Sequence, residues 1–151
     1  MSGPLLHNLH PATMSEEMYQ MIVIGHVTKD VINIPSHPAK IQVGGTVHYA
    51  AVALRALGGH VGAVTRLATH DDSLLDDMRS LGIHVHKHDS DVSTVMENTY
   101  EDPALSVRHQ RVQSIASAFV PADLDGIQSH VIQLGPLSNA EMSVCDVIDD
   151  R

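Results

Sequence analysis

The sequence predicts an α/β fold whose central sheet is mostly parallel. Short apolar runs rich in β-branched residues, typical of strands buried on both faces, alternate with segments whose apolar residues recur at helical spacing. The strands are expected near 21–26, 61–66, 83–87 and 131–134, and the helices near 47–57 and 72–81. Because helices and strands alternate along the chain, we expect the strands to run parallel with the helices packed on the sheet.

The helix expected at 47–57 begins at a glycine pair, Gly44–Gly45, and stops at Gly58. Adjacent glycines let the backbone adopt positive φ angles and come close to other groups. One interpretation is a turn after which the helix N-terminus offers free N–H groups to a ligand. The other is a tight turn that only starts a packing helix. The glycine pair by itself leaves both interpretations open.

Two further stretches alternate in polarity, as the strands of a small exposed sheet do. In the first, Pro35 and Pro38 separate two short pieces, which places these at an edge or turn rather than inside the central sheet. In the second, a turn at 101–103 joins two pieces as an antiparallel pair. The pieces lie at 31–34, 40–43, 94–100 and 107–112. We call this small sheet the lid; one uncovered apolar face would predict a partner there, such as a second copy of the chain.

The ends of the chain carry weaker signals. Residues 1–20 show no periodicity and are expected to form an irregular leader. The true start is left open among Met1, Met14, Met18 and Met21. A short helical connection is expected over 121–124, and Ser138 and Glu141 have the spacing of a capping box, which predicts the start of a helix.

Composition limits the classes of partner. The 151 residues suit one domain, and a formal net charge of −9 has the wrong sign for binding nucleic acid or an anionic membrane. The single cysteine, Cys145, excludes an internal disulfide and favours the cytoplasm. No apolar run approaches the roughly 20 residues that cross a bilayer, and the N-terminus lacks the pattern of a secretory signal.

The order of the motifs resembles the ribokinase-like (pfkB-type) carbohydrate kinases over residues 21–142. The matching features are the strand 22–25 followed by Asp30, the glycine pair before an alanine-rich helix, the strand ending at Leu67, the lid segments, Arg108-His109-Gln110 and Leu134-Gly135-Pro136. The resemblance implies an αβα sandwich with a small β-lid that closes over a sugar or nucleoside. A central sheet of about four strands is smaller than usual, so residues 21–151 are expected to be the N-terminal portion of such a kinase domain, with lid strands near 31–43 and 94–112.

The resemblance also implies where a substrate would bind. Asp30 and the backbone of Gly44 and Gly45 would hold substrate hydroxyls, since a carboxylate accepts hydrogen bonds and bare glycine backbone lets a ring come close. Tyr49 stands where kinases closest to ribokinase have Asn, so we expect a substrate other than ribose. Asn98 of the lid is expected to face this cluster.

The same resemblance implies ATP and Mg²⁺ as cofactors, but the sequence lacks the family's Gly-Ala-Gly-Asp motif. That motif supplies the catalytic base and an anion hole at a helix N-terminus. We therefore assign no catalytic residue and no cofactor site to this chain, and we expect it to be inactive alone. The alternatives are a non-catalytic sugar-binding or dimerisation module, or a gene fragment.

A competing hypothesis concerns histidines. His84, His86 and His88 share one face of an expected strand, and two of them, with Asp89, could bind a zinc-like ion. The alternative is a solvated strand face, which the absence of a nearby Cys or His pair favours. We therefore assign no metal ligand.

Overall fold

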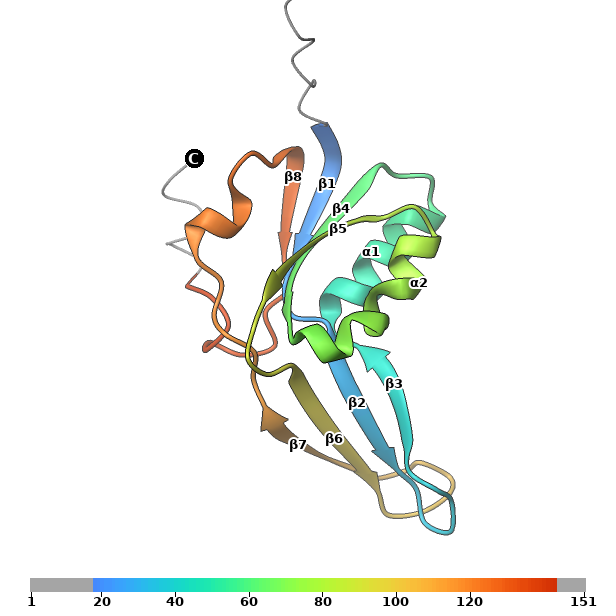
Figure 1. Cartoon of the computed structure of the whole chain (residues 1–151). Coiled ribbons are helices and arrows are strands. Elements are labelled where there is room, and N and C mark those ends of the chain that lie inside the picture. Colours follow the sequence, from blue (N-terminus) through green and yellow to red (C-terminus); the bar gives the residue numbers. More distant parts are fainter. Residues whose placement is uncertain (1–17, 144–151) are drawn as a thin grey trace, which may run out of the picture.

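The computed structural model describes residues 18–143, which form two four-stranded sheets (Figure 1). The central sheet is parallel, with the strand order β5-β4-β1-β8. Its strands are β1 (Met18–Ile24), β4 (Val61–Leu67), β5 (His84–Asp89) and β8 (Gln128–Leu134). The predicted α/β fold is therefore confirmed, and each predicted strand of this sheet overlaps an observed one.

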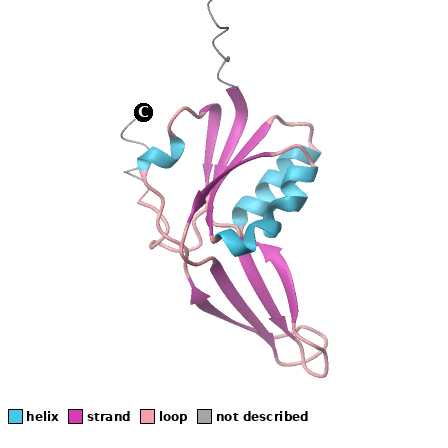
Figure 2. Cartoon of the chain, viewed as in Figure 1, coloured by secondary structure: helices cyan, strands magenta, loops and turns pink. Residues whose placement is uncertain are grey.

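Strand β1 lies between β4 and β8, and its apolar sequence explains this position. Successive side chains of a strand enter opposite faces, and here both faces are covered. Val23 is fully buried and packs on one face with Val47 of helix α1 (Thr46–Ala56). Ile22 is 1% exposed and packs on the other face with Phe119. Figure 2 shows the helices α1 and α2 together on the first face, whereas mostly loop segments cover the second.

Helix α1 lies where the sequence predicts a helix, to within one residue at each end. Gly45 precedes it with φ +94° and Gly58 follows it with φ +87°, so both glycines occupy the left-handed region. The predicted connection over 121–124 is the 3₁₀ helix η2 (Pro121–Leu124).

The single helix predicted at 72–81 is wrong in its geometry. The chain instead forms a 3₁₀ helix, η1 (Thr69–Leu75), followed by a short α-helix, α2 (Asp76–Ser80). The physical reason lies in Asp71, which accepts hydrogen bonds from the Lys29 ammonium at 2.8 Å and the Ser93 hydroxyl at 2.7 Å. These two hydrogen bonds hold the first turn of η1 against the start of the lid strands. The tighter 3₁₀ geometry lets Asp71 reach both donors.

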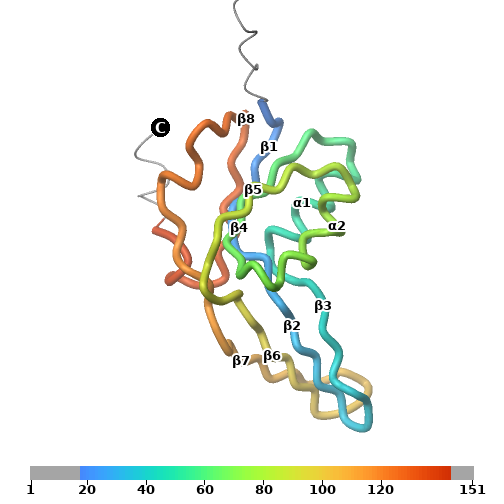
Figure 3. Tube along the Cα trace, viewed as in Figure 1, coloured from blue at the N-terminus to red at the C-terminus, as the bar shows by residue number. Residues whose placement is uncertain are grey.

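The lid is confirmed as a separate sheet, in the strand order β3-β2-β6-β7. Its strands are β2 (Thr28–Asn33), β3 (Lys40–Gly44), β6 (Thr94–Tyr100) and β7 (Arg108–Ser114). The two outer pairs are antiparallel, and the central pair β2–β6 is parallel. Figure 3 shows the lid projecting from the end of the central sheet, with β2 continuing the path of β1.

Two boundary predictions need correction. Strand β1 begins at Met18, so residues 18–20 belong to the sheet and not to an irregular leader; Tyr19, only 3% exposed, pairs with Ser129 of β8. Residues 138–141 form a turn instead of starting a helix, and the Glu141 side chain is buried beside His26. Met1, Met14, the rest of the leader and Cys145 lie outside the described residues.

No helix within residues 18–143 is long and apolar enough to span a membrane.

Candidate ligand-binding site

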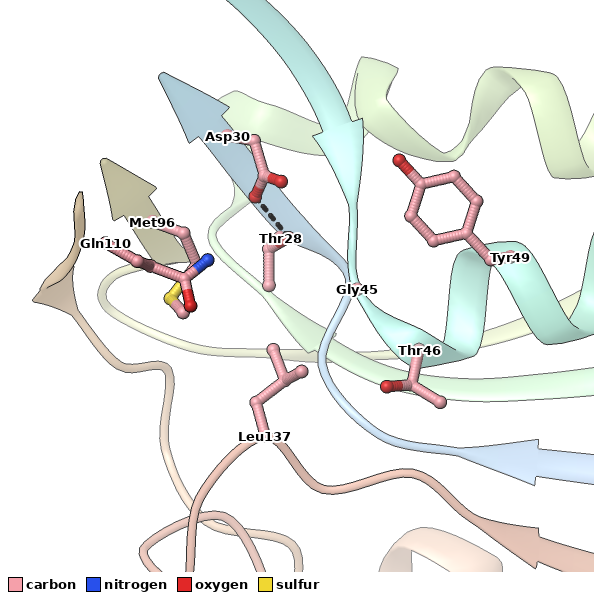
Figure 4. Close-up of a pocket in the computed structure, with 8 residues that line it drawn as sticks. All are labelled: Thr28, Asp30, Gly45, Thr46, Tyr49, Met96, Gln110 and Leu137. Atoms are coloured by element: carbon pink, nitrogen blue, oxygen red, sulfur yellow. Dashed lines mark hydrogen bonds between the residues drawn. The ribbon is translucent and has the colours of Figure 1, made fainter. Parts of the chain in front are cut away.

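A pocket of about 290 Å³ lies where the lid meets the N-terminus of α1 (Figure 4). Its lining comes from β2, β6 and β7 of the lid, from the start of α1, and from the loop after β8. The lining residues are Thr28, Asp30, Gly45, Thr46, Tyr49, Met96, Gln110 and Leu137. Segments far apart in the sequence thus meet at the end of the parallel sheet, where α/β folds commonly bind ligands.

Asp30 is the carboxylate of the pocket. Thr28, two residues earlier on the same face of β2, donates its hydroxyl hydrogen to Asp30 Oδ1 at 2.7 Å. Gly44 pairs with Thr28 across the lid, and a Cβ atom at Gly44 would lie 2.5 Å from Asp30 Oδ2. Gly44 is not among the lining residues, and its missing side chain leaves the room that the Asp30 carboxylate occupies.

Gly45 lines the pocket and has a separate steric reason to be glycine. A Cβ atom there would collide with the carbonyl oxygen of His26, because the chain passes tightly against the connection between β1 and β2. No side chain caps the helix that follows. The positive end of the α1 dipole consequently lies at the pocket wall.

Tyr49 and Leu137 form apolar parts of the wall. Tyr49, in the first turns of α1, is 56% exposed, and its hydroxyl donates to the Val43 carbonyl oxygen at 3.4 Å. Its ring meets the His48 ring edge-on, with centroids 5.3 Å apart. Leu137 reaches the pocket from the loop after β8, and Met96 from the lid (Figure 4).

Asn98 does not line the pocket. It is 2% exposed, and its Oδ1 accepts a hydrogen bond at 2.9 Å from the side-chain amide of Gln110, which does line it. Asn98 thus holds a pocket residue in place. Five further lining residues were not predicted from the sequence, namely Thr28, Thr46, Met96, Gln110 and Leu137. Strand alternation could have indicated Thr28, because it shares a face with Asp30.

A buried polar cluster joins the lid to the central sheet. His26 is fully buried, its Nε2 donates to the Ser117 carbonyl oxygen at 3.1 Å, and its Nδ1 accepts from the Thr94 hydroxyl at 2.8 Å. The Glu141 carboxyl lies 3.7 Å from His26 Nδ1, and its Oε2 has no hydrogen-bond partner. Burial lowers the pKa of His26 to about 4 and raises the pKa of Glu141. The neutral forms of both groups are therefore favoured.

On the opposite face of the lid, Lys29 is held away from the pocket. Its ammonium pairs with Asp71, whose carboxylate also accepts from the Ser93 hydroxyl. Burial acts to raise the pKa of Asp71, but the hydrogen bonds from Lys29 and Ser93 outweigh it and leave this pKa below its usual value. The ion pair between Lys29 and Asp71 thus links β2 to η1. It also neutralises the charge of Lys29, which precedes Asp30 on the strand.

The histidine and acidic side chains of the described part of the chain do not gather into a metal site. Within residues 18–143, no group of three or more His, Cys, Asp or Glu side chains is placed to hold a metal ion. His84 and His86 each lie 3.0 Å from the Tyr19 hydroxyl, so the predicted strand face serves internal contacts. Glu101, in the turn after β6, pairs with His109 at 2.6 Å.

The fold and the pocket define a class: an α/β protein whose β-lid borders a ligand pocket at the end of a parallel sheet. Among solved structures, a pyrophosphate-dependent kinase in the ribokinase family, complexed with a pyrophosphate analog and myo-inositol, is 28% identical with a TM-score of 0.74. It is matched over 86% of this chain and 44% of its own. A sulfate complex of a pyrophosphate-dependent kinase in that family is 30% identical with a TM-score of 0.72, over 82% and 43% of the two chains.

More distant structures share the fold alone. Ribokinase from Giardia lamblia is 13% identical with a TM-score of 0.68, over 87% of this chain and 47% of its own. The chain therefore spans less than half the length of these kinases. A scan with protein-family models and a search of curated proteins find no match. The chain has a partial ribokinase-like fold, and the predicted resemblance to the ribokinase family of sugar kinases is confirmed.

Proposed function

We propose that this chain is the acceptor-binding part of a carbohydrate kinase-type protein and that its pocket binds a small polyhydroxylated compound. The observation that carries the proposal is the position of Asp30, which shares one pocket with Gly45 and Tyr49 from α1 and Gln110 from the lid. A carboxylate accepts hydrogen bonds from neighbouring hydroxyls, and the amide of Gln110 both donates and accepts. Such a lining suits a sugar, a nucleoside or a cyclic polyol.

The structural neighbours support the same class of acceptor. The structure of the kinase that is 28% identical is a complex with myo-inositol. The structure of the more distant aminoimidazole riboside kinase from Salmonella enterica is a complex with aminoimidazole riboside. The pocket of about 290 Å³ lies near the lower end of ordinary ligand pockets, roughly 300 Å³ and above. A monosaccharide-sized ligand fits this volume better than a large one.

We assign no phosphoryl transfer to the 151 residues by themselves. Transfer requires a positioned base and charge stabilisation at the phosphate, and the Gly-Ala-Gly-Asp motif that supplies these in the family is absent from the sequence. ATP or pyrophosphate, with Mg²⁺, would have to be held by residues other than those described. A non-catalytic sugar-binding module is the second candidate function, and the same missing motif favours it.

Binding is tested by titrating the ¹⁵N-labelled chain with myo-inositol and ribose and following the amide chemical shifts. Asp30→Ala removes the carboxylate and should weaken binding by about 1.5–3 kcal/mol, the cost of losing a charge-assisted hydrogen bond. Asp125→Ala, an acid-to-alanine change at an exposed loop position, is the matched control and should leave binding unchanged. Equal affinity of the Asp30 variant and the wild type would contradict the proposed site.

A turnover assay separates the two candidate functions. The purified chain should not phosphorylate myo-inositol or ribose with either ATP or pyrophosphate. Measured transfer would overturn the assignment of inactivity and would favour a complete kinase, while the binding result would stand.

A further inference from the structure

The first observation is the charge of the pocket. Among its eight lining residues Asp30 is an acid, and none is Lys, Arg or His. Lys29, its neighbour on β2, points to the other face of the lid and pairs with Asp71 at 2.8 Å. The N-terminus of α1 contributes about half a positive charge, less than the full negative charge of the carboxylate. A negatively charged ligand would therefore meet net repulsion.

The second observation is the distribution of apolar surface. Figure 4 shows Tyr49 and Leu137 on sides of the pocket away from Asp30, with Met96 beside Gln110. Thr28 lies next to the Asp30 carboxylate, whereas Thr46 lies between Tyr49 and Leu137. The pocket therefore offers polar groups on more than one side, and its apolar groups come from three separate elements. A ring-shaped polyol has hydroxyls around its rim and C–H groups on its faces, so it can satisfy both kinds of wall. A linear polyol has no such face to place on an aromatic ring.

The third observation is the state of Tyr49. Its hydroxyl is directed to the Val43 carbonyl oxygen at 3.4 Å, and its ring contacts His48 only through an edge-on arrangement. More than half of the side chain remains exposed although it lies at a pocket wall. The hydroxyl thus has a partner of its own, and the exposed ring is available to a ligand.

We propose that this pocket selects ring-shaped polyols without negative charge, and that Tyr49 is the specificity-determining residue, packing its ring against the C–H face of the ligand. The inference rests on the proposed acceptor-binding function. It adds a basis for rejecting two other kinds of hydroxyl-rich compound, linear polyols and acidic sugars. Packing on the Tyr49 ring selects against linear polyols, and the Asp30 carboxylate selects against acidic sugars.

The test uses four probes with the full chain, and the dissociation constants are measured by amide chemical shifts. The probes are myo-inositol and glucose as neutral rings, glucitol as a linear hexitol and glucuronate as an acidic ring. The neutral rings should bind about fivefold more tightly than glucitol, the scale of one aromatic contact. They should bind at least about tenfold more tightly than glucuronate, since opposing charges a few ångströms apart are screened incompletely in a pocket.

Three variants assign the selection to residues. Tyr49→Ala should abolish the preference for rings over glucitol, whereas the matched control Tyr49→Phe keeps the ring and should retain it. Alanine suits an exposed helix position, so the fold should persist. Asp30→Asn should reduce the discrimination against glucuronate relative to glucose, while the preference for rings over glucitol remains.

The outcomes distinguish this inference from the proposed function. If no probe binds, the acceptor-binding function fails and the inference fails with it. If polyols bind but glucitol or glucuronate binds as tightly as the neutral rings, the inference alone is overturned. The same holds if Tyr49→Phe loses the ring preference along with Tyr49→Ala, because the hydroxyl would then be the determining group.

Discussion

The central sheet and the lid have the same number of strands in residues 18–143, yet different forces hold them together. Most of β1 and β4 is buried, with apolar clusters on both faces of the sheet. Strand β7 of the lid is exposed over nearly its whole length, and its cross-strand contacts are polar, such as Arg111 with Glu97 at 2.6 Å. Exposed ion pairs contribute little to stability. The lid therefore depends on its attachment to the central sheet.

The comparison explains where the pocket lies. In a site between the central sheet and the weakly stabilised lid, the sheet residues stay in place while the lid residues can adjust to a ligand. Ligand-binding segments tend to be the less stable parts of a fold. The buried cluster of His26, Thr94 and Glu141 sits at this boundary. It fixes β6 and the loop that carries Leu137 relative to the sheet.

The largest effect should come from matched truncations in the two sheets. Ile24→Ala in β1 removes a fully buried side chain and should lower the free energy of unfolding by about 2–5 kcal/mol. Ile41→Ala in β3, where the side chain is 58% exposed, should change it by less than about 0.5 kcal/mol. Urea unfolding of both variants measures the difference. Equal costs would show that the lid is as tightly packed as the central sheet.

A change of pH should have an intermediate effect on the free energy of unfolding, through His26 and Glu141 at the boundary between the two sheets. Burial lowers the pKa of His26 to about 4, with a further contribution from Arg66, so between pH 4 and 6.5 the unfolded chain binds more protons at this group. The free energy of unfolding should rise with pH across that window. Glu141 acts in the opposite sense, because its raised pKa makes the folded chain keep a proton above pH 4.5.

Glu141→Gln removes the opposing contribution and leaves that of His26. The free energy of unfolding should therefore rise more steeply between pH 4 and 6.5 in this variant. His26 by itself contributes a total rise of up to about 3 kcal/mol over this window. Urea unfolding at a series of pH values measures it, and His26→Gln in the same background should flatten the profile. A Glu141→Gln profile identical to that of the wild type would show that this carboxyl does not titrate in the window.

The smallest effect on stability concerns the outer face of the lid. Ile41 pairs with Val31 on the face opposite Asp30, and we expect this face to form a homodimer contact. Ile41→Lys should convert a dimer to a monomer in sedimentation velocity while changing the free energy of unfolding of the monomer by less than about 0.5 kcal/mol. Leu57→Lys, at an 85% exposed position after α1, is the control. A wild-type chain that stays monomeric at high concentration would contradict the expected dimer.

Much of this architecture could be predicted from local sequence. The apolar runs of β1 and β4 match strands buried on both faces, the alternation at 94–100 and 107–112 matches the antiparallel pair β6–β7, and Gly45 and Gly58 bound a helix as expected. Each of these signals lies within a few neighbouring residues. Backbone conformation and hydrophobic periodicity act over that range, so the sequence by itself determined these elements.

The rest was decided by contacts between segments far apart in the chain. Asp71 forms a 3₁₀ turn because it bonds to Lys29 and Ser93, and Glu141 enters the core beside His26 instead of starting a helix. Asn98 lies behind the pocket wall and accepts a hydrogen bond from Gln110, and Leu137 forms part of that wall. The sequence near Asp71, Leu137 and Glu141 does not encode these positions, because burial and hydrogen bonding between segments far apart in the chain depend on the packed structure.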